Sequence, residues 1–198
     1  MRTAIRALAF FAALTVGTPV NVAADWLFTP FLGRTFLGST SIIDLDDATD
    51  KNHWNFGGMV TLLGSGPVGV EGLIVVTPGF FEQEDSDLVS DSRTLALMGN
   101  VFVTKPLRPT DHGWRLFASA GAGLLHASTT DLLGLLPVRA NLLGYNVGGG
   151  AMVLGRTFGV RLELRHFGNL KPSDDTGNAI GRTRLRYWSA GAGVVFRY

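Results

Sequence analysis

The clearest pattern in this sequence is an alternation of apolar residues with small or charged ones, repeated every two positions. It is plainest over residues 158–165, FGVRLELR, where every second residue is apolar and the residues between are glycine or charged. A period of two puts the two sets on opposite faces of a β-strand, whereas the 3.6-residue period of an α-helix would mix them. This segment is therefore predicted to be a strand with one apolar face.

Seven further segments carry the same alternation, and together they predict eight strands, at about residues 25–36, 53–64, 67–81, 92–105, 114–126, 142–154, 158–168 and 183–198. Short turns alternate with long polar connections, and the long ones cover residues 37–52, 82–91, 127–141 and 169–182. Outer-membrane barrels have this arrangement, with short turns at the periplasm and long loops outside. We therefore predict an all-β fold, an eight-stranded antiparallel up-and-down transmembrane β-barrel with both termini at the periplasmic rim.

Aromatic residues gather at the predicted strand ends, where side chains of this kind favour the headgroup level of a bilayer. The periplasmic band would hold Trp26, Trp114, Phe158, Phe196 and Tyr198, and the outer band Trp54, Phe81, Tyr145, Phe167 and Trp188. The alternative is a soluble lipocalin-type barrel, which also has eight alternating strands but turns its apolar face inward. The aromatic bands, and a polar face with few lysines and many glycines, favour the membrane barrel.

The first 24 residues have the pattern of a secretory signal peptide. Arg2 and Arg6 precede an apolar run over residues 7–14, and small residues follow at Ala23 and Ala24. We expect cleavage after Ala24, which leaves a barrel domain over residues 25–198. An N-terminal core helix is the alternative.

Composition narrows the choice of function. Glycine supplies 26 of the 198 residues and charged residues only 17%, against averages of about 7% and about 25%. The net charge of +1 offers no basic surface for nucleic acid. The chain has no cysteine, so it has neither disulfides nor a thiolate metal site. We expect a monomer that binds no cofactor.

The C-terminal run over residues 188–198 resembles the last strand of Gram-negative outer-membrane proteins. In that family a final aromatic residue and alternating apolar residues are recognised by the barrel-assembly machinery, and Val194, Phe196 and Tyr198 occupy the matching positions. Residues 26–33 look like the opening strand of small barrels of the OmpA transmembrane-domain and OmpX type. The resemblance implies an outer-membrane location, contact with outer-membrane lipids and lipopolysaccharide, and a structural or surface-interaction role.

Charged residues on the predicted inner face form the first candidate site. They are Glu71, Arg115, Arg161, Glu163 and Arg165, with Arg197 near the rim. An eight-stranded lumen is just wide enough for side chains to fill, and buried charges must be paired. We therefore expect a polar plug, with a narrow channel for small solutes as the alternative.

His126 and Ser128 form the second candidate. A His-x-Ser pair at a strand end resembles the lipid A deacylase barrels, in which the histidine is the general base for a serine nucleophile that an acid orients. The chain departs from that motif, because Thr129 replaces its asparagine and no acid lies on the next strand. We expect no catalysis, with an acyl-ester hydrolase as the alternative.

The long connections offer weaker candidates. The first two are acidic, through Asp44, Asp46, Asp47 and Asp50 and then Glu82, Glu84, Asp85 and Asp87. The third contains an apolar cluster at 132–137, which is a contact site, a loop folded into the mouth, or a place where strands five and six extend. The histidines at 53, 112 and 166 lack the spacing of a metal site.

Overall fold

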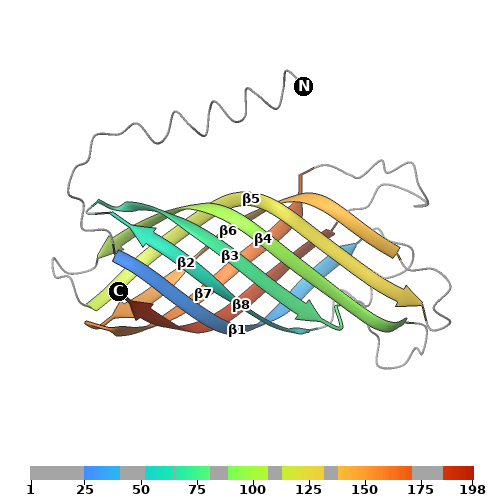
Figure 1. Ribbon diagram of the computed structural model, residues 1–198, viewed down its shortest axis with the longest axis horizontal. Coiled ribbons are helices and arrows are strands. Elements are labelled where there is room, and N and C mark those ends of the chain that lie inside the picture. Colours follow the sequence, from blue (N-terminus) through green and yellow to red (C-terminus); the bar gives the residue numbers. More distant parts are fainter. Residues whose placement is uncertain are drawn as a thin grey trace, which may run out of the picture.

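The computed structural model describes residues 25–40, 52–64, 66–80, 89–106, 113–131, 138–170 and 185–198. These residues form eight antiparallel strands (Figure 1): β1 (Asp25–Thr40), β2 (Trp54–Leu63), β3 (Val68–Pro78), β4 (Val89–Pro106), β5 (Gly113–Asp131), β6 (Val138–Leu154), β7 (Phe158–Asn169) and β8 (Leu185–Arg197). Each strand pairs with the next, and β8 pairs with β1 to close the barrel. The predicted fold class is confirmed.

Asp25 and Tyr198 lie at the same end of the barrel, which we call the termini end; the opposite end is the loop end. Trp26 and Tyr198 exchange two backbone hydrogen bonds there, at N–O distances of 3.4 and 3.0 Å. The guanidinium of Arg197 also contacts the carboxylate of Asp25 at 2.6 Å. These contacts join the first and last strands where the barrel closes. No helix in the described part of the chain is long and apolar enough to cross a bilayer.

The largest departure from the sequence prediction is at the loop end of β5 and β6. Residues 127–141 were predicted to be a loop, but β5 continues to Asp131 and β6 begins at Val138. The backbone pairing runs on through Ser128 with Arg139. The prediction of a long loop is therefore wrong, and the alternative of extended strands holds. Hydropathy fails to find this extension because the apolar alternation ends there while the ladder of backbone hydrogen bonds continues.

A smaller correction concerns β3, which ends at Pro78 instead of at residue 81. Proline has no backbone N–H to donate to a ladder, so it commonly marks the end of strand pairing. The chain turns directly afterwards, since Gly79 has a positive φ of 64°.

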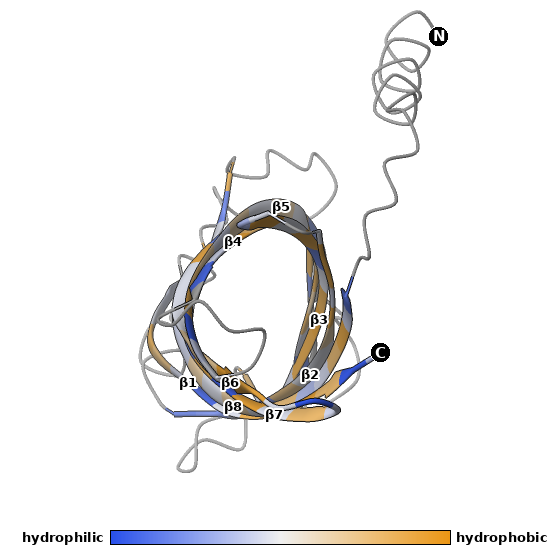
Figure 2. Cartoon of the chain, turned by 90° about the vertical axis from the view of Figure 1, so that its left-hand side faces the viewer, coloured by the Kyte–Doolittle hydropathy of each residue, from blue (hydrophilic) through white to orange (hydrophobic). Residues whose placement is uncertain are grey.

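The outward face of the wall is apolar, as the view along the barrel in Figure 2 helps to follow. Large apolar side chains there are more than half exposed, among them Val70, Val101 and Leu162. A water-soluble barrel of the lipocalin type has the opposite arrangement. The exposed apolar wall therefore excludes that alternative and matches the lipid-facing surface of a membrane barrel.

The inward face holds two buried apolar clusters as well as polar side chains. The cluster nearer the loop end includes Phe80, Leu125 and Tyr187, and the one nearer the termini end includes Leu27, Phe102 and Phe117. The lumen is therefore filled by apolar side chains towards both ends.

Candidate functional sites in the lumen and on the outward face

Four charged side chains meet in the lumen between the two apolar clusters. Glu71 accepts hydrogen bonds from Arg161 at 2.7 Å and from Arg165 at 2.9 Å. Glu163 binds the same two arginines, at 2.7 Å and 3.2 Å. All four side chains are at most 8% exposed. Two carboxylates and two guanidiniums balance in charge, so the cost of taking each ion out of water is offset by two contacts of opposite sign.

This charged layer crosses the whole barrel. Glu71 is on β3, whereas Arg161, Glu163 and Arg165 are on β7, four strands away in either direction around the eight-stranded wall. The Glu71–Arg161 and Glu71–Arg165 ion pairs therefore connect opposite walls and occupy the centre of the lumen. Arg115 lies near the start of β5, in register with Met152.

Neutral polar groups complete the charged layer. Thr61 and Asn100 donate to the carboxylate of Glu71 at 3.2 and 3.0 Å. Asn146 donates to the side-chain oxygen of Asn100 at 2.7 Å and accepts a hydrogen bond from Arg165. These residues add β2, β4 and β6 to the network. No sequence motif marks these three residues, although their positions in the alternation of each strand place them on the inner face.

The charged layer rests directly on the apolar cluster at the termini end. The guanidinium carbon of Arg161 lies 4.2 Å from the ring centre of Phe117 and 5.3 Å from that of Phe102. A guanidinium at these distances is attracted to the negative face of an aromatic ring. Because the two rings are also stacked, at 5.2 Å, Arg161 is held from below by aromatic groups and from the side by carboxylates.

Small residues on the inner face leave room for this layer. A Cβ on Gly121 would lie 2.1 Å from the side-chain oxygen of Asn100, and one on Gly150 would lie 1.9 Å from the backbone oxygen of Leu162. Real atoms do not approach so closely, so both positions require glycine for steric reasons.

The aromatic band at the loop end differs in one member from the sequence prediction. Tyr145, His166 and Trp188 form a row on the outward face, with ring centres 5.8 and 5.0 Å apart. Phe167 was predicted to join this band but is only 1% exposed and stacks on Tyr187 inside the lumen. The assignment was wrong because strict alternation from Leu164 puts His166 outward and Phe167 inward. Phe81 lies outside the described residues.

The predicted His126–Ser128 pair lies on the outward face of β5 near the loop end. The Nδ1 atom of His126 is 2.7 Å from the side-chain oxygen of Asn141, its partner in register on β6. No hydrogen bond joins His126 to Ser128 in the described part of the chain. The group that orients the histidine is thus a neutral amide. This contact was not predicted from the sequence, because residue 141 was expected to lie in a loop.

The remaining candidates are either peripheral or outside the described residues. Val194 is exposed on the outward face of β8, Tyr198 is exposed directly after the end of this strand, and Phe196 contacts Phe28 and Phe158 through its ring. No group of metal-binding side chains occurs among the residues that the structure describes. The acidic connections and the apolar cluster at 132–137 lie outside those residues.

Solved structures resemble this chain over most of its length, although no protein-family model and no curated protein sequence matches it. Neisserial surface protein A is 12% identical over 89% of this chain and 99% of its own, with a TM-score of 0.60. The N-terminal β-barrel domain of Pseudomonas aeruginosa OprF is 15% identical over 88% and 97%, with a TM-score of 0.53. Ail, the attachment invasion locus protein of Yersinia pestis, solved with the heparin analogue sucrose octasulfate, is 15% identical over 87% and 98%, with a TM-score of 0.51. The chain therefore has the fold of the small eight-stranded outer-membrane barrels, as in the OmpA and OmpX type.

Proposed function

We propose that this protein is an integral barrel of the Gram-negative outer membrane with a structural or surface-interaction role. The observation that carries the proposal is the apolar outward wall, which would be unstable in water. Two aromatic bands bound this wall, with Trp114 and Phe158 at the termini end and Trp54 and Trp188 at the loop end. In this proposal the termini end faces the periplasm, the loop end faces outward, and residues 1–24 are a signal peptide removed after Ala24.

Cell fractionation and heat-modifiable gel migration test the location. We expect the protein in the outer-membrane fraction, released only by detergent, with faster migration before boiling than after. N-terminal sequencing should begin at Asp25. A mature chain that stays in solution without detergent would refute the proposal.

A surface role is supported by strands that are longer than a membrane requires. A spanning strand needs about 9–11 residues, whereas β4 has 18 and β5 has 19. The extra residues extend beyond the aromatic band at the loop end, where they would form a rigid stem above the membrane.

The orientation has a direct test because the chain contains no cysteine. Arg93 and Lys105 are both exposed and point outward near opposite ends of β4. We expect a membrane-impermeant maleimide to label R93C on intact cells and K105C only after the outer membrane is permeabilised. The reverse labelling pattern would show that the barrel has the opposite orientation in the membrane.

The filled lumen supports a role without solute transport. The charged layer bridges β3 and β7, and apolar clusters lie on both sides of it. Planar-bilayer recording of the purified protein should show no steady conductance. A stable single-channel current would instead favour the narrow channel that the sequence left open.

A role for the last strand in assembly stays part of the proposal. Val194, Phe196 and Tyr198 are the positions that match the signal read by the barrel-assembly machinery. Replacing Tyr198 with serine should lower the amount of folded protein in the outer membrane, while Tyr198→Phe should not. Equal amounts of folded protein for the two variants would argue against a role of Tyr198 in assembly.

An acyl-ester hydrolase acting on lipid A is the second candidate, and the contact between His126 and Asn141 is the observation in its favour. An amide can orient a catalytic histidine, as in the Cys-His-Asn proteases. Against it, Ser128 makes no hydrogen bond to His126 within the described residues. Ser128→Ala should leave the acyl pattern of lipid A unchanged in mass spectra. Loss of one acyl chain from lipid A with the wild-type protein, but not with Ser128→Ala, would establish the enzyme.

A further inference from the structure

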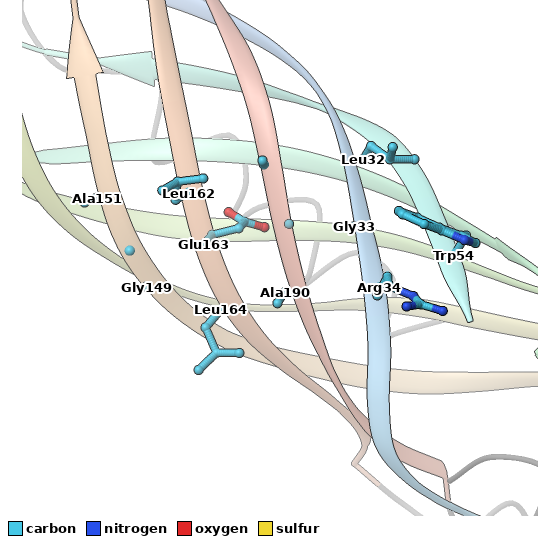
Figure 3. Close-up of a pocket in the computed structure, with 13 residues that line it drawn as sticks. Leu32, Gly33, Arg34, Trp54, Gly149, Ala151, Leu162, Glu163, Leu164 and Ala190 are labelled. Atoms are coloured by element: carbon cyan, nitrogen blue, oxygen red, sulfur yellow. The ribbon is translucent and has the colours of Figure 1, made fainter. Parts of the chain in front are cut away.

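A groove crosses the outward surface of β8 and its neighbours (Figure 3). It has a volume of about 640 Å³, within the range of about 300–1,000 Å³ typical of sites for small molecules. Most of its lining residues are apolar or glycine. The two charged ones are Arg34, at one edge, and Glu163, whose side chain is only 8% exposed and is paired with Arg161 and Arg165. The groove lies on the part of the wall that faces lipid in the proposed function.

The strand register explains the hollow. Ala190 and Ala192 project outward from β8, and longer side chains flank them on both sides. On β7 the register partners of these alanines are Leu164 and Leu162, and on β1 they are Arg34 and Leu32. Adjacent strands are about 4.8 Å apart, so the flanking strands stand roughly 10 Å apart across the alanine floor. That width suits one extended acyl chain.

The position of Arg34 identifies the end of the groove that meets the headgroups. Arg34 is nearer the loop end of β1 than Leu32, and its guanidinium lies 4.9 Å from the ring centre of Trp54, at the loop-end start of β2. The side chains of Arg34 and Trp54 lie together beside β1 (Figure 3), which leaves the alanine floor uncovered. Trp54 is 56% exposed and belongs to the aromatic band at headgroup level.

Arg34 has no acidic partner in the described part of the chain. Among the described residues no ion pair involves Arg34, and Asp25, Glu71 and Glu163 are each paired with other arginines. A charged side chain on a lipid-facing surface is rare and usually functional, with a specific partner. An anionic headgroup beside an apolar chain would complement both Arg34 and the groove.

We propose that this groove binds a phosphorylated acyl lipid of the outer leaflet, with one acyl chain over Ala190 and Ala192 and its phosphate against Arg34. The inference rests on the proposed membrane location. It predicts a preference for anionic over zwitterionic lipid of about fivefold, the contribution of one arginine near a lipid surface. Random annular contact would give no such preference.

Fluorescence quenching in vesicles tests the proposal. A variant that keeps only Trp54, with the other three tryptophans changed to phenylalanine, is folded into phosphatidylcholine vesicles that contain brominated phosphatidic acid or brominated phosphatidylcholine over the same series of mole fractions. We expect half-quenching of Trp54 at about fivefold less phosphatidic acid than phosphatidylcholine. A variant that keeps only Trp114, at the termini end, should show no preference.

Substitutions separate the headgroup contact from the acyl groove. Arg34→Gln should abolish the lipid preference, whereas Arg34→Lys should keep it. Ala190→Leu fills the floor and should reduce the preference, while Ala120→Leu, an equally exposed alanine on β5 outside the groove, should not. A preference that Ala190→Leu leaves intact would overturn the acyl site.

Equal quenching by the two lipids of the variant that keeps only Trp54, with Arg34 and Ala190 unchanged, would overturn the whole inference. Heat-modifiable migration of the same samples reports insertion independently. Insertion without lipid preference refutes only the lipid site, whereas failure to insert refutes the proposed membrane location as well.

Discussion

The two surfaces of the barrel wall carry their charges in different ways. Inside, Glu71, Glu163, Arg161 and Arg165 are buried in four ion pairs with equal numbers of each sign. Outside, Arg34 is exposed and rests on the ring of Trp54, without an ion pair to any described carboxylate. A single step along a strand separates the two environments, since the inward Glu163 lies between the outward Leu162 and Leu164.

This contrast shows what decides the cost of a charge at each surface. In the lumen the cost depends on partners, because the surrounding medium is protein and one missing ion leaves another uncompensated. On the lipid face it depends on depth, because a charge near a headgroup is hydrated or paired and one at the midplane is not. The same residue type should therefore respond to different changes on the two faces.

Removing one carboxylate from the lumen should have the largest effect. Glu71→Leu leaves Arg161 and Arg165 with Glu163 as their remaining carboxylate in the charged layer, so the free energy of unfolding should fall by about 3–5 kcal/mol. Equilibrium unfolding with guanidinium in lipid vesicles measures this loss. The double variant Glu71→Leu/Arg161→Met restores the charge balance and should recover part of it. Strictly additive losses would contradict a coupled network.

A charge added to the lipid face tests the other half of the contrast. Val101 is outward and 56% exposed, five residues from the termini end of β4, near the middle of the apolar wall. Val101→Arg should lower the free energy of unfolding by about 2–4 kcal/mol, whereas Phe158→Arg, at the start of β7, should cost only about 0–1 kcal/mol. Similar losses in the same vesicle assay would show that depth does not govern this surface.

Substitutions of two glycines compare the inward and outward faces without changing any charge. Gly121→Ala puts a Cβ 2.1 Å from the side-chain oxygen of Asn100 inside the lumen, so it should destabilise the barrel by about 1–3 kcal/mol. Gly72→Ala on the outward face meets nothing within 4 Å and should stabilise it by about 0.5–1 kcal/mol. We expect the two substitutions to change the free energy of unfolding in opposite directions in the same assay. A stable Gly121→Ala would mean that the network can shift.

Much of this arrangement follows from the sequence, because alternation fixes the face of every strand residue once one residue is placed. Parity put Glu71, Arg161, Glu163 and Arg165 on the inner face, and it would have put Phe167 there as well had it been applied strictly. The eight strands followed from the same signal. Parity alone could not show that Phe102 and Phe117 fill the lumen beneath Arg161, because apolar residues on both faces weaken the alternation.

The cross-strand partners could not be predicted from the sequence, because they depend on the register between neighbouring strands. The contact of His126 with Asn141 requires β5 and β6 to stay paired to within a few residues of their connection. The hydropathy pattern predicted strands that are too short at this end, because side chains beyond the apolar wall need not alternate between apolar and polar. The groove over Ala190 likewise requires the register of β7, β8 and β1 together, which no local pattern encodes.

The last expected effect concerns a single hydroxyl in the lumen. Tyr187 is 1% exposed, and its hydroxyl has no hydrogen-bond partner within the described part of the chain. A buried polar group without a partner costs free energy, so Tyr187→Phe should raise the free energy of unfolding by about 1 kcal/mol while keeping the ring contacts with Phe80 and Phe167. Tyr145→Phe on the outward face is the matched control and should change stability by less than about 0.5 kcal/mol. A loss of stability in Tyr187→Phe would show instead that the hydroxyl has a hydrogen-bond partner in the folded protein.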